Sequence, residues 1–201
     1  MKSIYFIFFL FSCTAQYAQA QLIPLDSLKK MKVYDQLSIA EQNPLDVYRL
    51  HLTKQKLTEF PDAIFLFPNL NELVLDKNKI DSLPPELSQM ENLQILSISS
   101  NQLDTISPCI LKLKNLVRLD LSNNFIGSIP NDIDSLSKLE SLILWDNPIQ
   151  EYPSTLEDLP QLSVLDLLHN QISYETQDKL REMLPKAKLI MSDPCTCEDG
   201  E

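Results

Sequence analysis

The residues of this chain that could do chemistry are few, and their spacing matches no catalytic motif. Only two histidines are present, His51 and His169. No serine or cysteine nucleophile has a base at a recognisable spacing. The chain has two glycines, Gly127 and Gly200, so a glycine-rich loop that could hold a phosphate is absent. We therefore expect no catalytic residue, no metal ligands and no cofactor.

The elements that must position these residues follow from a repeat of 23 residues without insertions. Each copy has an apolar residue, Leu three positions later and Leu or Ile two further; in five copies Asn follows, and each copy then has another apolar residue. The L-x-L alternation predicts a strand with one buried and one exposed face. Most copies then continue with an apolar residue and proline, as at Phe60-Pro61. The six copies begin at Val47, Leu70, Leu93, Leu116, Leu139 and Leu162.

The unit resembles the leucine-rich repeat family; its pattern is L-x-x-L-x-L-x-x-N-x-L-x-x-(L/I/F/Y)-P-x-x-I-x-x-L-x-x. Within the family it is most similar to the 23-residue type of Shoc-type Ras scaffold proteins and disease-resistance proteins, over residues 47–189. The resemblance implies an α/β solenoid, a leucine-rich repeat horseshoe with six repeats. Its parallel sheet would line the concave face, between helical N- and C-terminal caps. Family members are recognition or scaffold modules in signalling.

Asparagine recurs at the ninth position of five copies. In the family such asparagines form an internal ladder that satisfies backbone groups where each strand turns away, so the resemblance implies a structural role. The first copy has Gln55 there, which indicates a looser turn. The ladder residues are Asn78, Asn101, Asn124, Asn147 and Asn170.

On such a sheet the remaining pairs of reactive groups do not indicate an enzyme. At about 4.8 Å per strand, His51 and His169 would be roughly 24 Å apart, too far to share a proton or a metal ion. Asp120 and Asp166 would be about 10 Å apart, near the separation used by inverting glycosidases. Aspartate at this position is, however, common on leucine-rich strands as a solvated or hydrogen-bonded group.

Residues 1–20 are typical of a secretory signal peptide, with a short apolar run and the cleavage pattern Ala18-Gln19-Ala20. The mature chain would then be secreted, periplasmic or in the cell envelope, as in a bacterial exported protein. The less favoured alternative is a lipoprotein anchored through Cys13, because Phe11 is bulky for that motif. No later segment is long and apolar enough to cross a membrane.

Residues 21–46 are expected to cap the N-terminal end of the repeats, which occupy residues 47–184. An apolar stripe that includes Leu28 and Leu37 predicts one amphipathic helix over residues 26–42, ended by Asn43-Pro44.

Residues 185–201 are expected to add an edge strand at 186–191, after a helix over 174–184, and to end in an acidic tail. Cys195 and Cys197 in this tail could form a local disulfide, remain free thiols, pair with another chain or bind a soft metal ion. Metal is the least favoured, since a closed zinc site needs four ligands. Cys109 is expected to be an unreactive small residue.

The net charge of −11 disfavours nucleic acids and anionic membranes as partners. Basic residues gather at one end of the predicted concave face (Arg49, Lys54, Lys77) and acidic residues at the other (Asp146, Asp166). Such a gradient could orient a partner.

The only tryptophan, Trp145, would lie on the concave face among apolar neighbours, an arrangement typical of protein-binding hot spots. The alternative is that it folds over these neighbours or is covered by the C-terminal segment. The expected partner-binding residues are Arg49, His51, Val74, Ile95, Arg118, Asp120, Ile143, Trp145, Val164, Asp166 and Leu168.

The sequence therefore favours a non-enzymatic module that binds a protein or peptide on its concave face. The alternative is a cell-surface adhesion or structural protein that binds glycan or another copy of itself, although glycan binding normally shows several exposed aromatic side chains. An inhibitor of an exported hydrolase is less favoured. The identity of the partner and the oligomeric state are not indicated.

Overall fold

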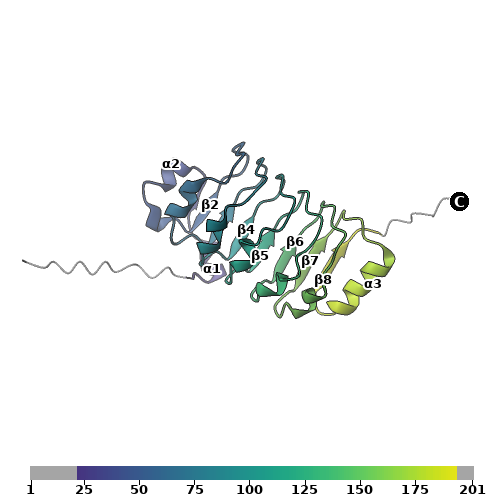
Figure 1. Ribbon diagram of the computed structural model, residues 1–201. Coiled ribbons are helices and arrows are strands. Elements are labelled where there is room, and N and C mark those ends of the chain that lie inside the picture. Colours follow the sequence, from purple (N-terminus) through teal and green to yellow (C-terminus); the bar gives the residue numbers. More distant parts are fainter. Residues whose placement is uncertain (1–21, 194–201) are drawn as a thin grey trace, which may run out of the picture.

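The computed structural model describes residues 22–193, which form an open sheet of eight parallel strands in sequence order (Figure 1). This confirms the predicted solenoid. The signal peptide expected at residues 1–20, with Cys13, and the tail cysteines Cys195 and Cys197 lie outside the described residues. The strands are β1 (Val33–Tyr34), β2 (Arg49–His51), β3 (Glu72–Val74), β4 (Ile95–Ser97), β5 (Arg118–Asp120), β6 (Ser141–Ile143), β7 (Val164–Leu167) and β8 (Lys188–Met191).

The register of β2 to β7 advances by one repeat at each step, so that equivalent residues stand side by side. Leu50 pairs with Leu73, and Leu73 with Leu96. Because a slip of one residue would turn every buried side chain outward, the constant repeat length fixes this register. The sheet gains β1 and β8 at its ends, outside this regular spacing: Val164 pairs with Lys188, one position beyond the 23-residue step.

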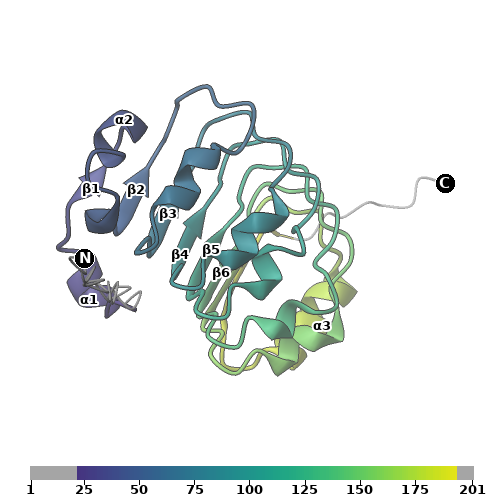
Figure 2. The same cartoon turned by 60° about the vertical axis from the view of Figure 1, so that its left-hand side comes forward.

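The core lies between one face of the sheet and a row of short 3-10 helices that packs against it (Figure 2). The inward residues of β4 and β5, among them Leu96 and Leu119, are fully buried, as is Ile133 from a facing helical turn. Prolines such as Pro153 directly precede several of these turns. The turns are η2 (Asp62–Leu66), η3 (Pro85–Gln89), η4 (Ile110–Lys112), η5 (Ile133–Ser135) and η6 (Ser154–Asp158).

The prediction of one helix over residues 26–42 is wrong. The structure has two four-residue helices there, α1 (Leu25–Leu28) and α2 (Leu37–Ala40), separated by β1 and followed by η1 (Pro44–Asp46). Val33 and Tyr34 are good strand formers, and their pairing with β2 satisfies the backbone of a strand that would otherwise be an edge. At the other end, α3 (Tyr174–Met183) begins after Ser173, whose hydroxyl accepts a hydrogen bond from the backbone N–H of Thr176.

The asparagines at the ninth position join each repeat to the one before it. The Nδ2 of Asn124 donates to the carbonyls of Ile98 and Leu121, at 2.9 and 3.0 Å. Its Oδ1 accepts from the backbone N–H of Leu103 at 3.0 Å. Equivalent bonds are made by Asn78, Asn101, Asn147 and Asn170. One buried amide therefore satisfies three backbone groups that the turn leaves unpaired.

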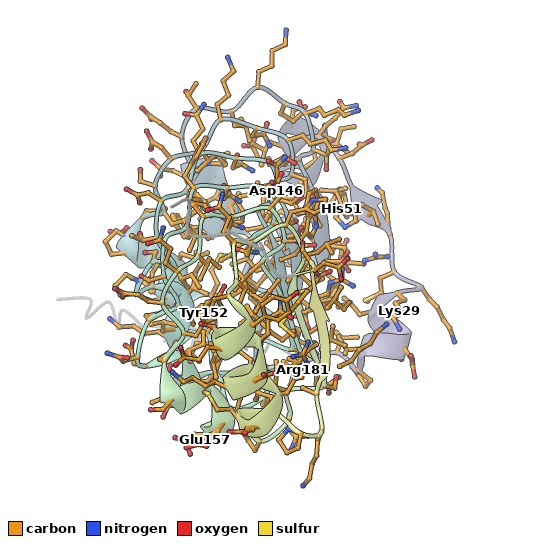
Figure 3. All side chains as sticks on the ribbon, turned by 90° about the vertical axis from the view of Figure 1, so that its right-hand side faces the viewer. Lys29, His51, Asp146, Tyr152, Glu157 and Arg181 are labelled. Atoms are coloured by element: carbon orange, nitrogen blue, oxygen red, sulfur yellow. The ribbon has the colours of Figure 1, made fainter. Side chains whose placement is uncertain are left out.

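The N-terminal segment, residues 22–31, folds back over the starts of β2 to β4. The backbone of Ile23 donates to Oδ1 of Asn71 at 3.1 Å and accepts from Nε2 of Gln94 at 2.6 Å. Leu28 is fully buried but is not part of the main core. Figure 3 shows Lys29 and its helix beyond the strands, on the same side as His51. The segment therefore covers one end of the sheet face that points away from the 3-10 helices. We call this face the open face.

A buried carboxylate holds this segment to the sheet. Glu72 accepts two hydrogen bonds from the guanidinium of Arg49, at 2.7 and 3.0 Å, and lies 2.6 Å from Nε2 of His51. Arg49 also donates to the carbonyls of Lys29 and Met31. Burial raises the pKa of Glu72, but the hydrogen bonds and charges of His51 and Arg49 outweigh it and lower the pKa to about 2.

We predict that Asn124→Ala lowers the free energy of unfolding by about 3 kcal/mol, because it leaves the buried carbonyl of Ile98 and the N–H of Leu103 without partners. The carbonyl of Leu121 keeps its bond from Asn147. Urea-induced unfolding followed by circular dichroism measures this. Asn131→Ala is the matched control, since Asn131 is exposed and makes no hydrogen bond within residues 22–193; it should cost less than about 0.5 kcal/mol. Equal losses in the two variants would contradict the role of the ladder.

We also predict that Glu72 contributes to stability above its unfolded pKa, near 4.5, and that this contribution is lost as the pH falls towards 2. Wild type and Glu72→Gln should be compared by urea unfolding at several pH values. The difference in their unfolding free energies should shrink by about 2 kcal/mol between pH 5 and pH 3, and by about 3 kcal/mol at pH 2.

The matched control is Asp178→Asn, which breaks an exposed ion pair with Arg181 and should change stability at pH 7 by less than about 0.5 kcal/mol. A difference between wild type and Glu72→Gln that does not vary with pH would show that Glu72 is not held ionised by Arg49 and His51.

Candidate functional site

The open face carries the outward side chains of the strands in two aligned rows. Strand pairing places each outward residue beside its equivalent in the next repeat. The first row is Arg49, Glu72, Ile95, Arg118, Ser141, Val164 and Lys188. The second row is His51, Val74, Ser97, Asp120, Ile143, Asp166 and Ile190.

At the β2 end, two of the expected partner-binding residues are engaged within the chain. Arg49 and His51 bind Glu72, and Arg49 is only 14% exposed at its side chain. The expected basic pole of the face is therefore weakened, because the charge of Arg49 is paired. Glu72 was not among the expected partner-binding residues. Its outward position in the repeat, equivalent to those of Arg49 and Ile95, could have identified it. Val74 and Ile95 are half-buried.

At the other end, four of the expected residues lie on two neighbouring repeats of the same face. Ile143, Trp145, Val164 and Leu168 come from β6, β7 and the residues directly after them, and each is half-buried. Trp145 and Leu168 are side by side, since the next residue, Asp146, donates its backbone N–H to the carbonyl of Leu168. Ile190 on β8 extends the group and was not predicted. We call these five residues the apolar patch.

Trp145 is thus neither fully exposed nor buried. Its ring meets that of His169 edge-on, with the ring centroids 6.4 Å apart and an interplanar angle of 84°. Just beyond, a groove of about 380 Å³ follows the rim where the strands end, and Asp146 and Phe125 line it. Phe125 is 63% exposed at a position that holds Lys, Gln or Pro in the other repeats. Figure 3 shows Asp146 at this rim.

Two carboxylates lie beside Ile143 of the apolar patch, and one of them, Asp166, stands between Ile143 and Ile190. Asp120 and Asp166 stand on either side of Ile143 in the second row. Oδ1 of Asp120 accepts from the hydroxyl and backbone N–H of Ser122, and Oδ2 is 3.7 Å from Arg118.

Oδ1 of Asp166 accepts from the backbone N–H of Leu168 at 3.1 Å, while its Oδ2 has no partner among residues 22–193. Asp166 therefore presents an acceptor for a cation beside apolar side chains.

Within the described residues, no three His, Cys, Asp or Glu side chains gather as metal ligands would, and no helix is long and apolar enough to cross a membrane. Cys109 is buried, with its sulfur 3.1 Å from the hydroxyl of Ser107.

A model of the "leucine-rich repeat region" family matches residues 64–192. No curated protein matches the sequence. Among solved structures, the chain is similar to a leucine-rich repeat protein of Leptospira interrogans, with a TM-score of 0.67 and 30% identity over 82% of this chain and 49% of that one.

The structure is also similar to two internalins of Listeria monocytogenes. The internalin inlF has a TM-score of 0.62 and 26% identity, over 81% of this chain and 47% of that one. Internalin C2 has a TM-score of 0.59 and 26% identity, over 75% and 63%. The chain spans about half the length of the Leptospira protein and of inlF. Since the family model covers more than half of a chain with this sheet and repeat, the protein belongs to the leucine-rich repeat family.

Proposed function

We propose that this protein is a non-enzymatic binding module whose apolar patch anchors an extended protein or peptide segment. The leucine-rich repeat fold suggests a protein-interaction module. The observation that carries the finer proposal is the gathering of Ile143, Trp145, Val164, Leu168 and Ile190 on the open face, away from the end that residues 22–31 cover.

The chemistry of the patch defines the segment that fits it. An aromatic side chain with aliphatic neighbours favours an apolar anchor on the partner, and Trp is enriched among such hot spots. The free Oδ2 of Asp166 and the nearby Asp120 and Asp146 favour Lys or Arg beside that anchor. A segment with an apolar residue flanked by basic residues therefore complements this face.

Selection from a displayed random peptide library on the purified protein tests the proposal. We expect enrichment of peptides with an apolar residue next to Lys or Arg. Binding of a selected, labelled peptide, followed by fluorescence anisotropy, should weaken at least about tenfold in Trp145→Ala/Leu168→Ala, or about 1.4 kcal/mol. Asp166→Asn should selectively reduce the preference for Lys or Arg over Gln.

The matched control is Leu66→Ala/Tyr174→Ala, which also removes one leucine and one aromatic ring; both side chains are 59% exposed and lie outside the open-face rows. It should bind within about twofold of wild type. Peptides that bind the two double variants equally well, or an enrichment of acidic peptides, would contradict the proposal.

We also propose that the chain is exported, on the basis of the apolar run and the Ala18-Gln19-Ala20 pattern near its start. Expression in a bacterial host, fractionation and mass determination of the amino terminus should give a protein outside the cytoplasm that begins at Gln21. A start at Cys13 with added lipid mass would show a lipoprotein instead. An intact amino terminus in the cytoplasm would contradict export.

A further inference from the structure

Four lysines form a compact array at the rim where β2 and β3 end. Lys54 and Lys77 occupy the eighth position of the first two repeats, and Lys56 and Lys79 the tenth. The backbone N–H of Lys54 donates to the carbonyl of Asp76 at 3.0 Å, which places Lys54 beside Lys77. The N–H of Lys79 donates to the carbonyl of Leu57 at 2.7 Å, which places it beside Lys56. We call these residues the lysine array.

The ammonium groups of the lysine array are not used within the described part of the chain. All four residues are exposed, and none has a carboxylate within 4.0 Å or a side-chain hydrogen bond within residues 22–193. The nearby Asp76 is directed elsewhere, because its Oδ1 accepts from the hydroxyl of Ser97 and the N–H of Ser99. Within residues 22–193 the array is therefore a cluster of unpaired lysine side chains, in a protein of net charge −11.

Lysine is also not the residue that this backbone prefers. Lys54, Lys56 and Lys77 have φ angles of 59°, 59° and 57°, in the left-handed region. Asparagine and aspartate enter that region more readily than residues with long side chains. Two later repeats have Asn123 and Asp146 at the eighth position, with φ of 53° and 56°. Backbone strain retained at a surface position supports a role for the side chain in binding.

We propose that the lysine array binds an anionic polysaccharide, at a site separate from the apolar patch. Neighbouring repeats are about 4.8 Å apart, so the four lysines form a small, dense cluster of positive charge that one segment of a linear polyanion can contact. A broad anionic surface such as a membrane would also meet the acidic remainder of the protein. Single-stranded nucleic acid normally needs aromatic stacking platforms, and the eighth and tenth positions of these two repeats hold none.

The test uses labelled dextran sulfate, with neutral dextran as the uncharged comparison, and measures affinity over a range of salt concentrations. The full array variant is Lys54→Asn/Lys56→Gln/Lys77→Asn/Lys79→Gln. The matched control, Lys30→Gln/Lys112→Gln/Lys186→Gln/Lys188→Gln, removes four other exposed lysines and changes the net charge equally. The array variant should bind at least about tenfold more weakly, and the control within about threefold of wild type.

The salt dependence gives a second readout. Four contacts predict a slope of log K against log salt near −3 for wild type, by analogy with single-stranded polyanions, and a slope close to zero for the array variant. Lys54→Asn/Lys77→Asn should also weaken binding while raising Tm by about 2–4 °C, because asparagine tolerates the left-handed turn. Weakened binding then cannot be attributed to misfolding.

Three results would overturn the proposal: no binding of dextran sulfate, equal losses in the array and control variants, or tighter binding of oligothymidylate or of phosphatidylserine vesicles than of dextran sulfate. The peptide-binding experiments are independent, since none of the four lysines belongs to the apolar patch. Loss of polysaccharide binding with peptide binding intact is the expected result for the array variant.

Discussion

The structure depends on satisfying the backbone where each strand ends. At that point the chain leaves the sheet, and its N–H and C=O groups are buried without a regular partner. A ladder asparagine such as Asn124 meets this need with one amide, which donates to two carbonyls and accepts from one N–H. Two of these bonds reach the preceding repeat, so they form only when every repeat has the same length. Uniform register, stacked leucines and aligned open-face rows follow from this.

The repeated part of the fold could be predicted because each of its elements is specified locally. Within six positions, Leu96, Ile98 and Asn101 indicate a strand, its buried face and the turn that ends it. The next copy has the same residue types at the same spacing. The unique segments carry no such signal. Val33 and Tyr34 form a strand only because β2 offers an edge, and no period in residues 22–46 indicates that edge.

The sequence predicted which side chains of the candidate site face outward, but not which of them are free of contacts within the chain. Alternation along the strands identified which side chains face outward, including Trp145 and Asp166. It did not indicate that Arg49 would be held by Glu72 in the next repeat and by carbonyls of Lys29 and Met31. These contacts join segments that sequence periodicity does not relate. The same limit applies to Ile190, which joins the apolar patch only through the pairing of β8 with β7.

At the eighth position of each repeat, the backbone conformation stays the same while the type of side chain changes. The residue there is left-handed in all six repeats, although it changes from Lys54 and Lys77 to Ser100, Asn123, Asp146 and His169. Its backbone N–H bonds to the neighbouring repeat in the first five, and to the hydroxyl of Ser192 in the last. The turn is therefore imposed by bonds between repeats and not by the preference of its own residue. Because the ladder supplies the stability, this position can carry positive charge at one end of the molecule and a carboxylate and imidazole at the other, without any change in the path of the chain.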